Sequence, residues 1–156
     1  MAEIQIGNFK RLTILHKALL FGQMIFAAIA VFLVYSGTKI AEIDKETEKV
    51  LQVTVIVFAV AAFFLGARIF KRKVQAARES SEALVKKFTA FTLASIIQWA
   101  LIEGATLFAI VCFLITGNYA FIVLAAVLMV LFVMMAPVRV KVAFLLGLSE
   151  DEVSSL

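Results

Sequence analysis

The chain has 156 residues, of which 63% are hydrophobic, and its mean hydropathy is +1.05. A water-soluble domain of this composition would leave large apolar surfaces in water, so the sequence excludes that class and indicates a lipid environment. The formal net charge of +4 does not indicate nucleic-acid binding, because the basic residues lie beside apolar runs, where lipid headgroups are expected. The single Cys excludes an internal disulfide and a multi-cysteine metal site.

Four apolar runs follow one another along the chain, and each is long enough for a helix that crosses a hydrocarbon core of about 30 Å. A basic segment is expected to continue the second helix beyond the membrane and to turn near Ser80 and Ser81. The fourth run is expected to end or kink at Pro137. The sequence therefore predicts an all-α, polytopic membrane protein with one four-helix domain over residues 1–156; its spans are about 18–35, 50–67, 88–115 and 119–136, and its helical extension is about 68–87.

The distribution of Lys and Arg predicts the orientation in the membrane. Twelve of these residues lie in the N-terminal, middle and C-terminal segments, and three lie between the first two runs. By the positive-inside rule, both termini are expected on the cytoplasmic side of a bacterial inner membrane, with the helices arranged as two hairpins. A faint internal repeat with an offset of eighty residues, which places Gln23 opposite Glu103, agrees with two hairpins of the same orientation.

Basic residues next to the spans are expected to anchor the chain at the lipid headgroups. His16 is expected to place its ring tip among headgroups at the same boundary, with a proton relay as the alternative. Ser149 and Glu152 have the spacing of a capping box, but too few residues follow them for us to expect a stable helix. The expected anchors are Arg68, Lys71, Arg72, Lys73, Arg139 and Lys141, of which the last two could also form a basic site for an acidic partner.

Glu103 is the residue that a membrane span accommodates least easily. It lies fifteen residues after Phe88 and twelve before Ile115, near the middle of the third run. An ionised carboxylate at that depth costs a few kcal/mol, so the side chain must be protonated or must face a partner or water. Helical geometry places four further polar or aromatic residues on about the same face: Thr92, Ser95, Trp99 and Thr106.

Two interpretations of Glu103 remain open. It could carry a proton or sodium ion, or it could be a protonated contact between helices. In either case Gln23, on the first run, is expected to hydrogen-bond to Glu103 at the centre of the bundle. Trp99 could shield Glu103 from lipid or could fill a gap between helices.

The segment Ala100–Val111, which reads ALIEGATLFAIV, resembles the carboxylate-bearing helix of rotary ATP synthase ring subunits and proteolipids. In that family the matching glutamate carries the transported proton or sodium ion, so the resemblance implies this role for Glu103 alone. The first apolar run differs from the glycine-rich first helix of these rings, because Gly22 is its one glycine before Gly37. The resemblance covers about a dozen residues.

The sequence contains no arrangement of residues typical of an enzyme: no Ser/His/Asp set, no metal-ligand cluster and no phosphate-binding glycine loop. We therefore expect no catalytic residues, no metal site and no cofactor. The expected partners are the lipid bilayer and either other membrane-protein subunits or further copies of the chain. The leading interpretation is a structural or accessory subunit of a larger membrane complex. The alternatives are a homo-oligomeric proton or sodium carrier that uses Glu103, and a sensor of the bilayer itself.

Overall fold

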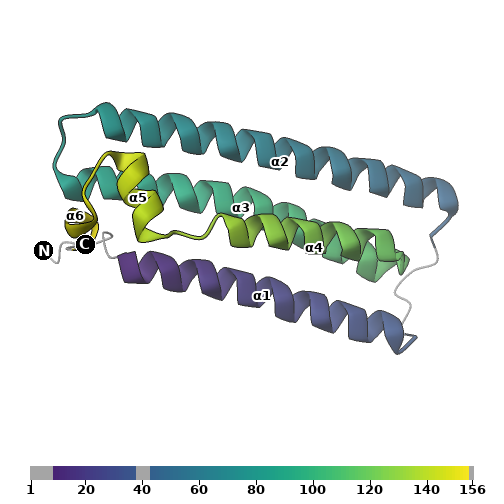
Figure 1. Cartoon of the computed structure of the whole chain (residues 1–156). Coiled ribbons are helices and arrows are strands. Elements are labelled where there is room, and N and C mark those ends of the chain that lie inside the picture. Colours follow the sequence, from purple (N-terminus) through teal and green to yellow (C-terminus); the bar gives the residue numbers. More distant parts are fainter. Residues whose placement is uncertain (1–8, 38–42, 155–156) are drawn as a thin grey trace, which may run out of the picture.

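The computed structural model describes residues 9–37 and 43–154, and every regular element in this part of the chain is a helix. Three long helices and one shorter helix lie side by side, and two short helices cover one end (Figure 1). In chain order the elements are α1 (Phe9–Tyr35), α2 (Lys45–Glu79), α3 (Leu84–Thr116), α4 (Tyr119–Met134), α5 (Arg139–Leu146) and α6 (Glu150–Ser154).

Three helices, α1, α2 and α3, are long and apolar enough to cross a membrane. At 1.5 Å per residue they are about 40 to 50 Å long, which exceeds the thickness of a hydrocarbon core. The helices α4 and α5 pass the same test together but are bent by 69° at the break that contains Pro137. The described part of the chain therefore has three candidate spans, or four if the bent pair counts as one. The environment that these helices suit is a lipid bilayer.

The break between α4 and α5 follows from the chemistry of proline. Pro137 has no amide hydrogen, so it cannot donate to the Val133 carbonyl in the way that continues a helix. The Val133 carbonyl instead accepts from the Ala136 amide at 3.1 Å, and α5 begins two residues after Pro137. The expected end or kink at Pro137 is confirmed.

The helix α3 occupies the centre of the bundle, with α1 and α2 on opposite sides of it and α4 alongside (Figure 1). Phe9 lies near Phe88 and His16 lies near Trp99, so α1 and α3 run parallel. The pairing into two hairpins holds for α3 and α4, which pack together. The helices α1 and α2, which were expected to form the first hairpin, each pack mainly against α3 and not against each other.

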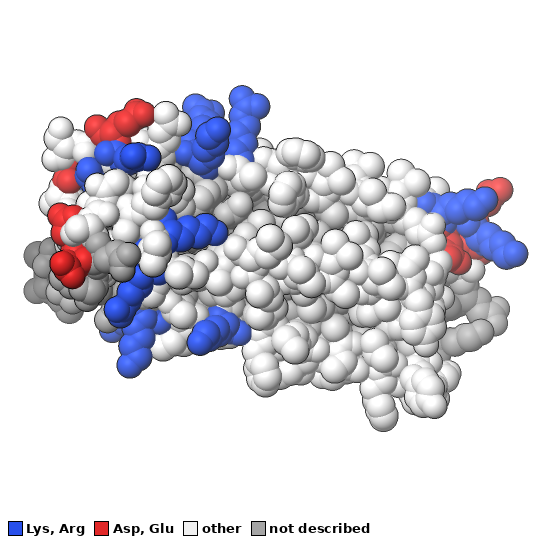
Figure 2. Space-filling view, in the orientation of Figure 1, with Lys and Arg blue, Asp and Glu red and all other residues white. Residues whose placement is uncertain are grey.

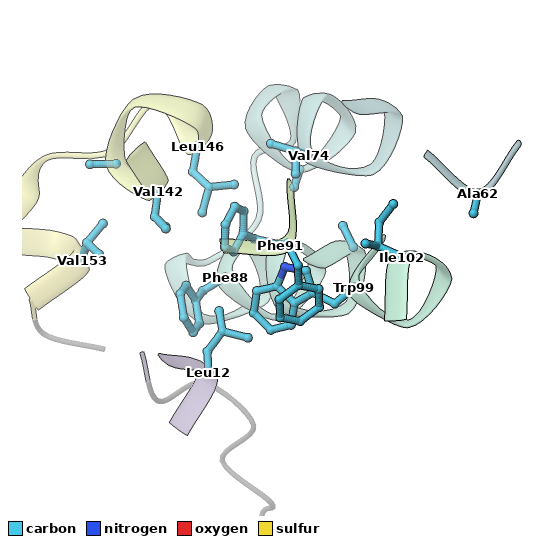
Figure 3. Close-up of a cluster of buried hydrophobic side chains, with 14 of the residues drawn as sticks. Leu12, Ala62, Val74, Phe88, Phe91, Trp99, Ile102, Val142, Leu146 and Val153 are labelled. Atoms are coloured by element: carbon cyan, nitrogen blue, oxygen red, sulfur yellow. The ribbon is translucent and has the colours of Figure 1, made fainter. Parts of the chain in front are cut away.

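The buried side chains form two clusters along α3. The cluster near α5 contains Trp99, Phe88, Leu146 and Val142, together with Leu12 of α1 (Figure 3). The other cluster lies toward the α3–α4 turn and is built around Phe113, Phe121, Val55 and Ala30. The core thus runs the length of the bundle, and α3 contributes to both parts.

The outer surface of the bundle is apolar. Large side chains such as Phe21, Phe32 and Phe64 are about two-thirds exposed (65%, 67% and 66%). Charged residues are instead concentrated at the two ends, with white, uncharged surface between them (Figure 2). This division is the one expected for a protein whose middle is surrounded by lipid.

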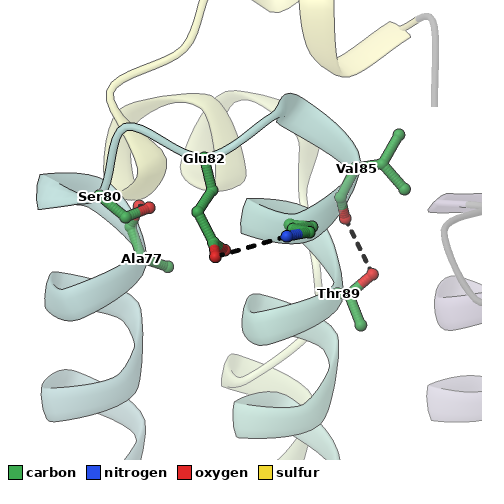
Figure 4. A network of polar contacts seen from close by, with 6 residues as sticks. Ala77, Ser80, Glu82, Val85 and Thr89 are labelled. Atoms are coloured by element: carbon green, nitrogen blue, oxygen red, sulfur yellow. Dashed lines mark hydrogen bonds and ion pairs between the residues drawn. The ribbon is translucent and has the colours of Figure 1, made fainter.

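Local signals fix the turns between helices. The helix α2 ends at Glu79, with Ser80 as its C-cap, and the Ser80 hydroxyl donates to the Ala77 carbonyl at 2.8 Å (Figure 4). Glu82 and Lys86 form an ion pair of 3.7 Å at the start of α3.

The expectation that the tail is not helical is wrong, because Ser149 and Glu152 form a reciprocal capping box at the start of α6. Val153 completes this end by packing into the core.

Candidate functional site

Glu103 lies beside a part of α3 that the other described helices cover incompletely. Trp99 points toward α1, where it contacts His16, and Leu101 points toward α2, where it lies beside Gly66. Successive residues of a helix are 100° apart, so Ala100 points between α1 and α2, and it is exposed. Between Leu93 and Val111, the residues within about 40° of this direction form what we call the open face of α3. They are Leu93, Ile96, Ala100, Gly104, Leu107 and Val111, with Glu103 at the edge of the face.

The open face leaves space beside Glu103. A Cβ atom added at Gly104 would meet no atom within 4 Å. Glu103 itself is half-buried, and within the described residues its carboxyl group forms no hydrogen bond or ion pair. The chain therefore presents a carboxyl group and a small residue together, at the level of its apolar middle.

The hydrogen bond that we expected between Gln23 and Glu103 is not formed. Gln23 is buried on the face of α1 that packs against the bundle, but neither its amide nitrogen nor its amide oxygen has a hydrogen-bond partner. It lies seven residues after His16, so it reaches the level of Thr106, seven residues after Trp99. Gln23 and Glu103 thus lie at similar positions along the bundle axis. Gln23 points into the bundle, however, whereas Glu103 points toward its edge.

The hydroxyl groups near Glu103 are used mostly within α3. Ser95 donates to the Phe91 carbonyl and Thr106 to the Ile102 carbonyl, both at 2.9 Å. Thr92 is buried and its hydroxyl has no partner. Together with Trp99 these residues are buried as a polar and aromatic stripe, and Glu103 lies at the edge of that stripe rather than within it.

His16 is buried inside the bundle, so the expectation that its ring tip lies among headgroups is wrong. Its Nε2 atom lies 2.9 Å from the Phe132 carbonyl oxygen. The ring stacks on the Phe132 ring at 4.6 Å and meets the Trp99 ring edge-on at 4.8 Å. Trp99 therefore packs in the space between α1 and α4.

The position of His16 depends on the break at Pro137. Near the end of α4 the regular hydrogen bonds are replaced, and the Phe132 carbonyl accepts from the Met135 amide at 3.0 Å as well as from His16. Pro137 is the signal that could have indicated an acceptor here, because a proline interrupts the regular hydrogen bonds to the carbonyl groups of the preceding turn. No local pattern in the sequence indicates that His16, 116 residues away, supplies the donor.

The expected headgroup anchors are exposed at one end of the apolar body (Figure 2). The guanidinium of Arg139 also lies 5.6 Å from the centre of the Phe9 ring, and the Lys141 ammonium donates to the Met134 carbonyl at 3.4 Å. These two residues of α5 thus connect the short helix to α1 and α4, in addition to any contact with lipid.

At the opposite end, sequence reasoning missed a polar link between α2 and the α3–α4 turn. The Asn118 side chain caps the start of α4 and donates to the Glu48 carboxylate. Gln52, one turn further along α2, also donates to Glu48 at 3.5 Å. The capping preference of Asn was readable from the sequence, but the pairing with Glu48 joins residues seventy positions apart.

Among the described residues, no group of three or more His, Cys, Asp or Glu side chains could hold a metal ion. Comparison with protein-family models, with curated proteins and with solved structures gives no match to this chain. The function must therefore be argued from the helices and from the open face of α3.

Proposed function

We propose that this protein is a structural or accessory subunit of a larger complex in a bacterial inner membrane, and that the open face of α3 is where it packs against another subunit. The observation that carries the proposal is the incompletely covered middle of the central helix, where Ala100 is exposed, Glu103 is half-buried and a Cβ atom added at Gly104 would meet no atom within 4 Å. A helix that is central to its own bundle would otherwise be covered on all sides.

The chemistry of this face favours a protein partner over lipid. An intramembrane carboxyl group exposed to acyl chains is expensive, and its cost falls when a neighbouring helix supplies a hydrogen-bond partner. Ala100 and Gly104 are small, so a second helix can approach α3 closely at this point.

The orientation belongs to the same proposal. The basic residues lie mainly at the end formed by the start of α1, the end of α2 and the helix α5 (Figure 2). By the positive-inside rule this end faces the cytoplasm, so both termini are cytoplasmic and α4 with α5 forms the fourth span.

The subunit content of the native complex tests the proposal. The protein is extracted from its own membrane in a mild detergent, and the mass and composition of the complex are measured. We expect other membrane proteins in fixed stoichiometry with this chain. A particle that contains this chain alone would contradict an accessory role.

The second candidate function is a proton or sodium carrier that uses Glu103 in a homo-oligomer. The observation that favours it is the lack of any partner for the Glu103 carboxyl group within the described residues, which leaves the group available to an ion. Under this function Glu103→Gln abolishes transport by the reconstituted protein while the protein still accumulates. Under the accessory function Glu103→Leu lowers assembly or protein level, and Glu103→Gln has a milder effect because it keeps a hydrogen-bonding group.

A further inference from the structure

A groove of about 480 Å³ lies between the end of α2 and the short helix α5. Its volume is within the range of small-molecule sites in proteins. Phe70 and Val74 of α2 and Leu145 of α5 supply its apolar lining, while Lys71 and Arg78 of α2 supply two positive charges. The groove thus combines an apolar surface with cationic groups.

Its position matches the boundary between hydrocarbon and headgroups. Lys71 is four residues beyond Ala67, where the apolar run of α2 ends, and at 1.5 Å per residue this corresponds to about 6 Å. On the other side of the groove, α5 exposes Val140 and Phe144, which are 58% and 74% exposed. An exposed apolar pair on a short helix beside basic residues is typical of an element that lies in the membrane interface.

The charges in the groove are arranged to receive an anion. Lys71 and Arg78 are seven residues apart, so they share one face of α2, and within the described residues neither side chain forms an ion pair. The groove contains one carboxylate, Glu79, which accepts a hydrogen bond from Gln75 at 2.9 Å. The groove therefore has two cationic groups against one carboxylate.

The end of α5 holds the Arg78 side chain in place. Gly147 caps α5 with φ of +66°, a conformation that favours glycine. A Cβ atom added at Gly147 would lie 3.3 Å from Nε of Arg78, so the arginine stem passes directly over this glycine. The 69° bend that follows α4 brings this turn against α2.

We propose that this groove binds one anionic glycerophospholipid. Lys71 and Arg78 contact its phosphate, and an acyl chain lies along Phe70 and Leu145. Binding at this site involves one lipid molecule in a defined groove. It therefore differs from the non-specific electrostatic attraction of all the basic residues to an anionic membrane surface. The site does not depend on the proposed accessory role.

The test uses the full chain in detergent with added dioleoyl phosphatidylglycerol or dioleoyl phosphatidylcholine, and native mass spectrometry counts the lipids that are retained. We expect one retained phosphatidylglycerol in preference to phosphatidylcholine. The double variant Lys71→Ala, Arg78→Ala is expected to weaken this binding about tenfold or more. The matched control is Arg72→Ala, Lys73→Ala, which removes the same charge from the same helix outside the groove and is expected to have a small effect.

Two further measurements sharpen the result. Glu79→Gln removes the carboxylate from the groove, so we expect it to tighten binding of phosphatidylglycerol. Excess inorganic phosphate is expected to leave the lipid bound, because the phosphate ion lacks the acyl chain that the apolar lining contacts. Equal loss in both double variants, no retained anionic lipid, or release of the lipid by inorganic phosphate would each overturn the proposal.

Discussion

His16 is the polar side chain on which the packing of α1 against α4 most depends. Replacing it by Phe keeps an aromatic ring but removes the hydrogen bond to the Phe132 carbonyl, and we expect a loss of about 1 kcal/mol in the free energy of unfolding. Replacing it by Ala also removes the contacts with Trp99 and Phe132, and we expect a loss of about 2–4 kcal/mol. Unfolding in mixed micelles measures both values. Equal stability of the wild type and His16→Ala would show that this contact does not hold the bundle.

Asp44 makes the start of α2 sensitive to acid. The amide and hydroxyl of Thr47, and then the amide of Glu46, donate to its carboxylate and hold the pKa of Asp44 below its ordinary value. The folded pKa is lowered, so the stabilisation is fully present above the ordinary pKa of about 4 and is lost as pH falls through the lowered pKa. We expect hydrogen exchange at the Glu46 and Thr47 amides, corrected for its intrinsic pH dependence, to lose protection in that range.

The control for this prediction is Asp44→Asn. Asn is also a good N-cap residue but does not titrate, so its protection should not change in the same range. An identical pH profile in the wild type and in Asp44→Asn would contradict the assignment to Asp44.

At the scale of the elements, small residues decide how closely α2 approaches α3. A Cβ atom added at Gly66 would lie 3.4 Å from Cγ of Gln98 and 3.5 Å from Cδ1 of Leu101, whereas one added at Gly104 would meet nothing. Gly66→Leu is therefore expected to cost about 1–3 kcal/mol of stability. Gly104→Leu, with the same gain in helix propensity, should leave the isolated chain as stable as the wild type or slightly more stable. Equal destabilisation by the two substitutions would show that Gly104 is covered within the chain.

The helices themselves could be predicted from the sequence because their signals are local. Four apolar runs and Pro137 were enough to predict an all-helical membrane protein and the break after α4. The packing of α1 was not predictable in this way. The connection between α1 and α2 suggests a packed hairpin, but which helix α1 contacts depends on complementary surfaces on α3 and α4.

The candidate site could likewise be predicted from the sequence only in part. Helix periodicity correctly groups Thr92, Ser95, Trp99 and Thr106 on one buried face, because that grouping needs only a constant rotation per residue. It does not reveal that Glu103 lies at the edge of that face, since this depends on where α1 and α2 stop covering α3. The burial of His16 likewise depends on a carbonyl group in another helix.

At the scale of the whole molecule, the bundle has charged ends, an apolar body and one central helix that is covered incompletely. Near the middle of α3, Trp99 and Ile102 are buried whereas Ala100 is exposed, so the incomplete coverage belongs to one face of the helix and not to the whole middle of the bundle. We therefore propose that the molecule assembles through this one surface.

The most direct test of this claim is the subunit content of the native complex from two variants, Ala100→Leu and Ala126→Leu. Both alanines are exposed near the middle of a helix, but Ala100 lies on the open face of α3 and Ala126 lies on α4. We predict that Ala100→Leu releases the partner subunit that we propose, while the chain itself remains folded, and that Ala126→Leu retains it. Retention of the partner by both variants would contradict docking through the open face of α3.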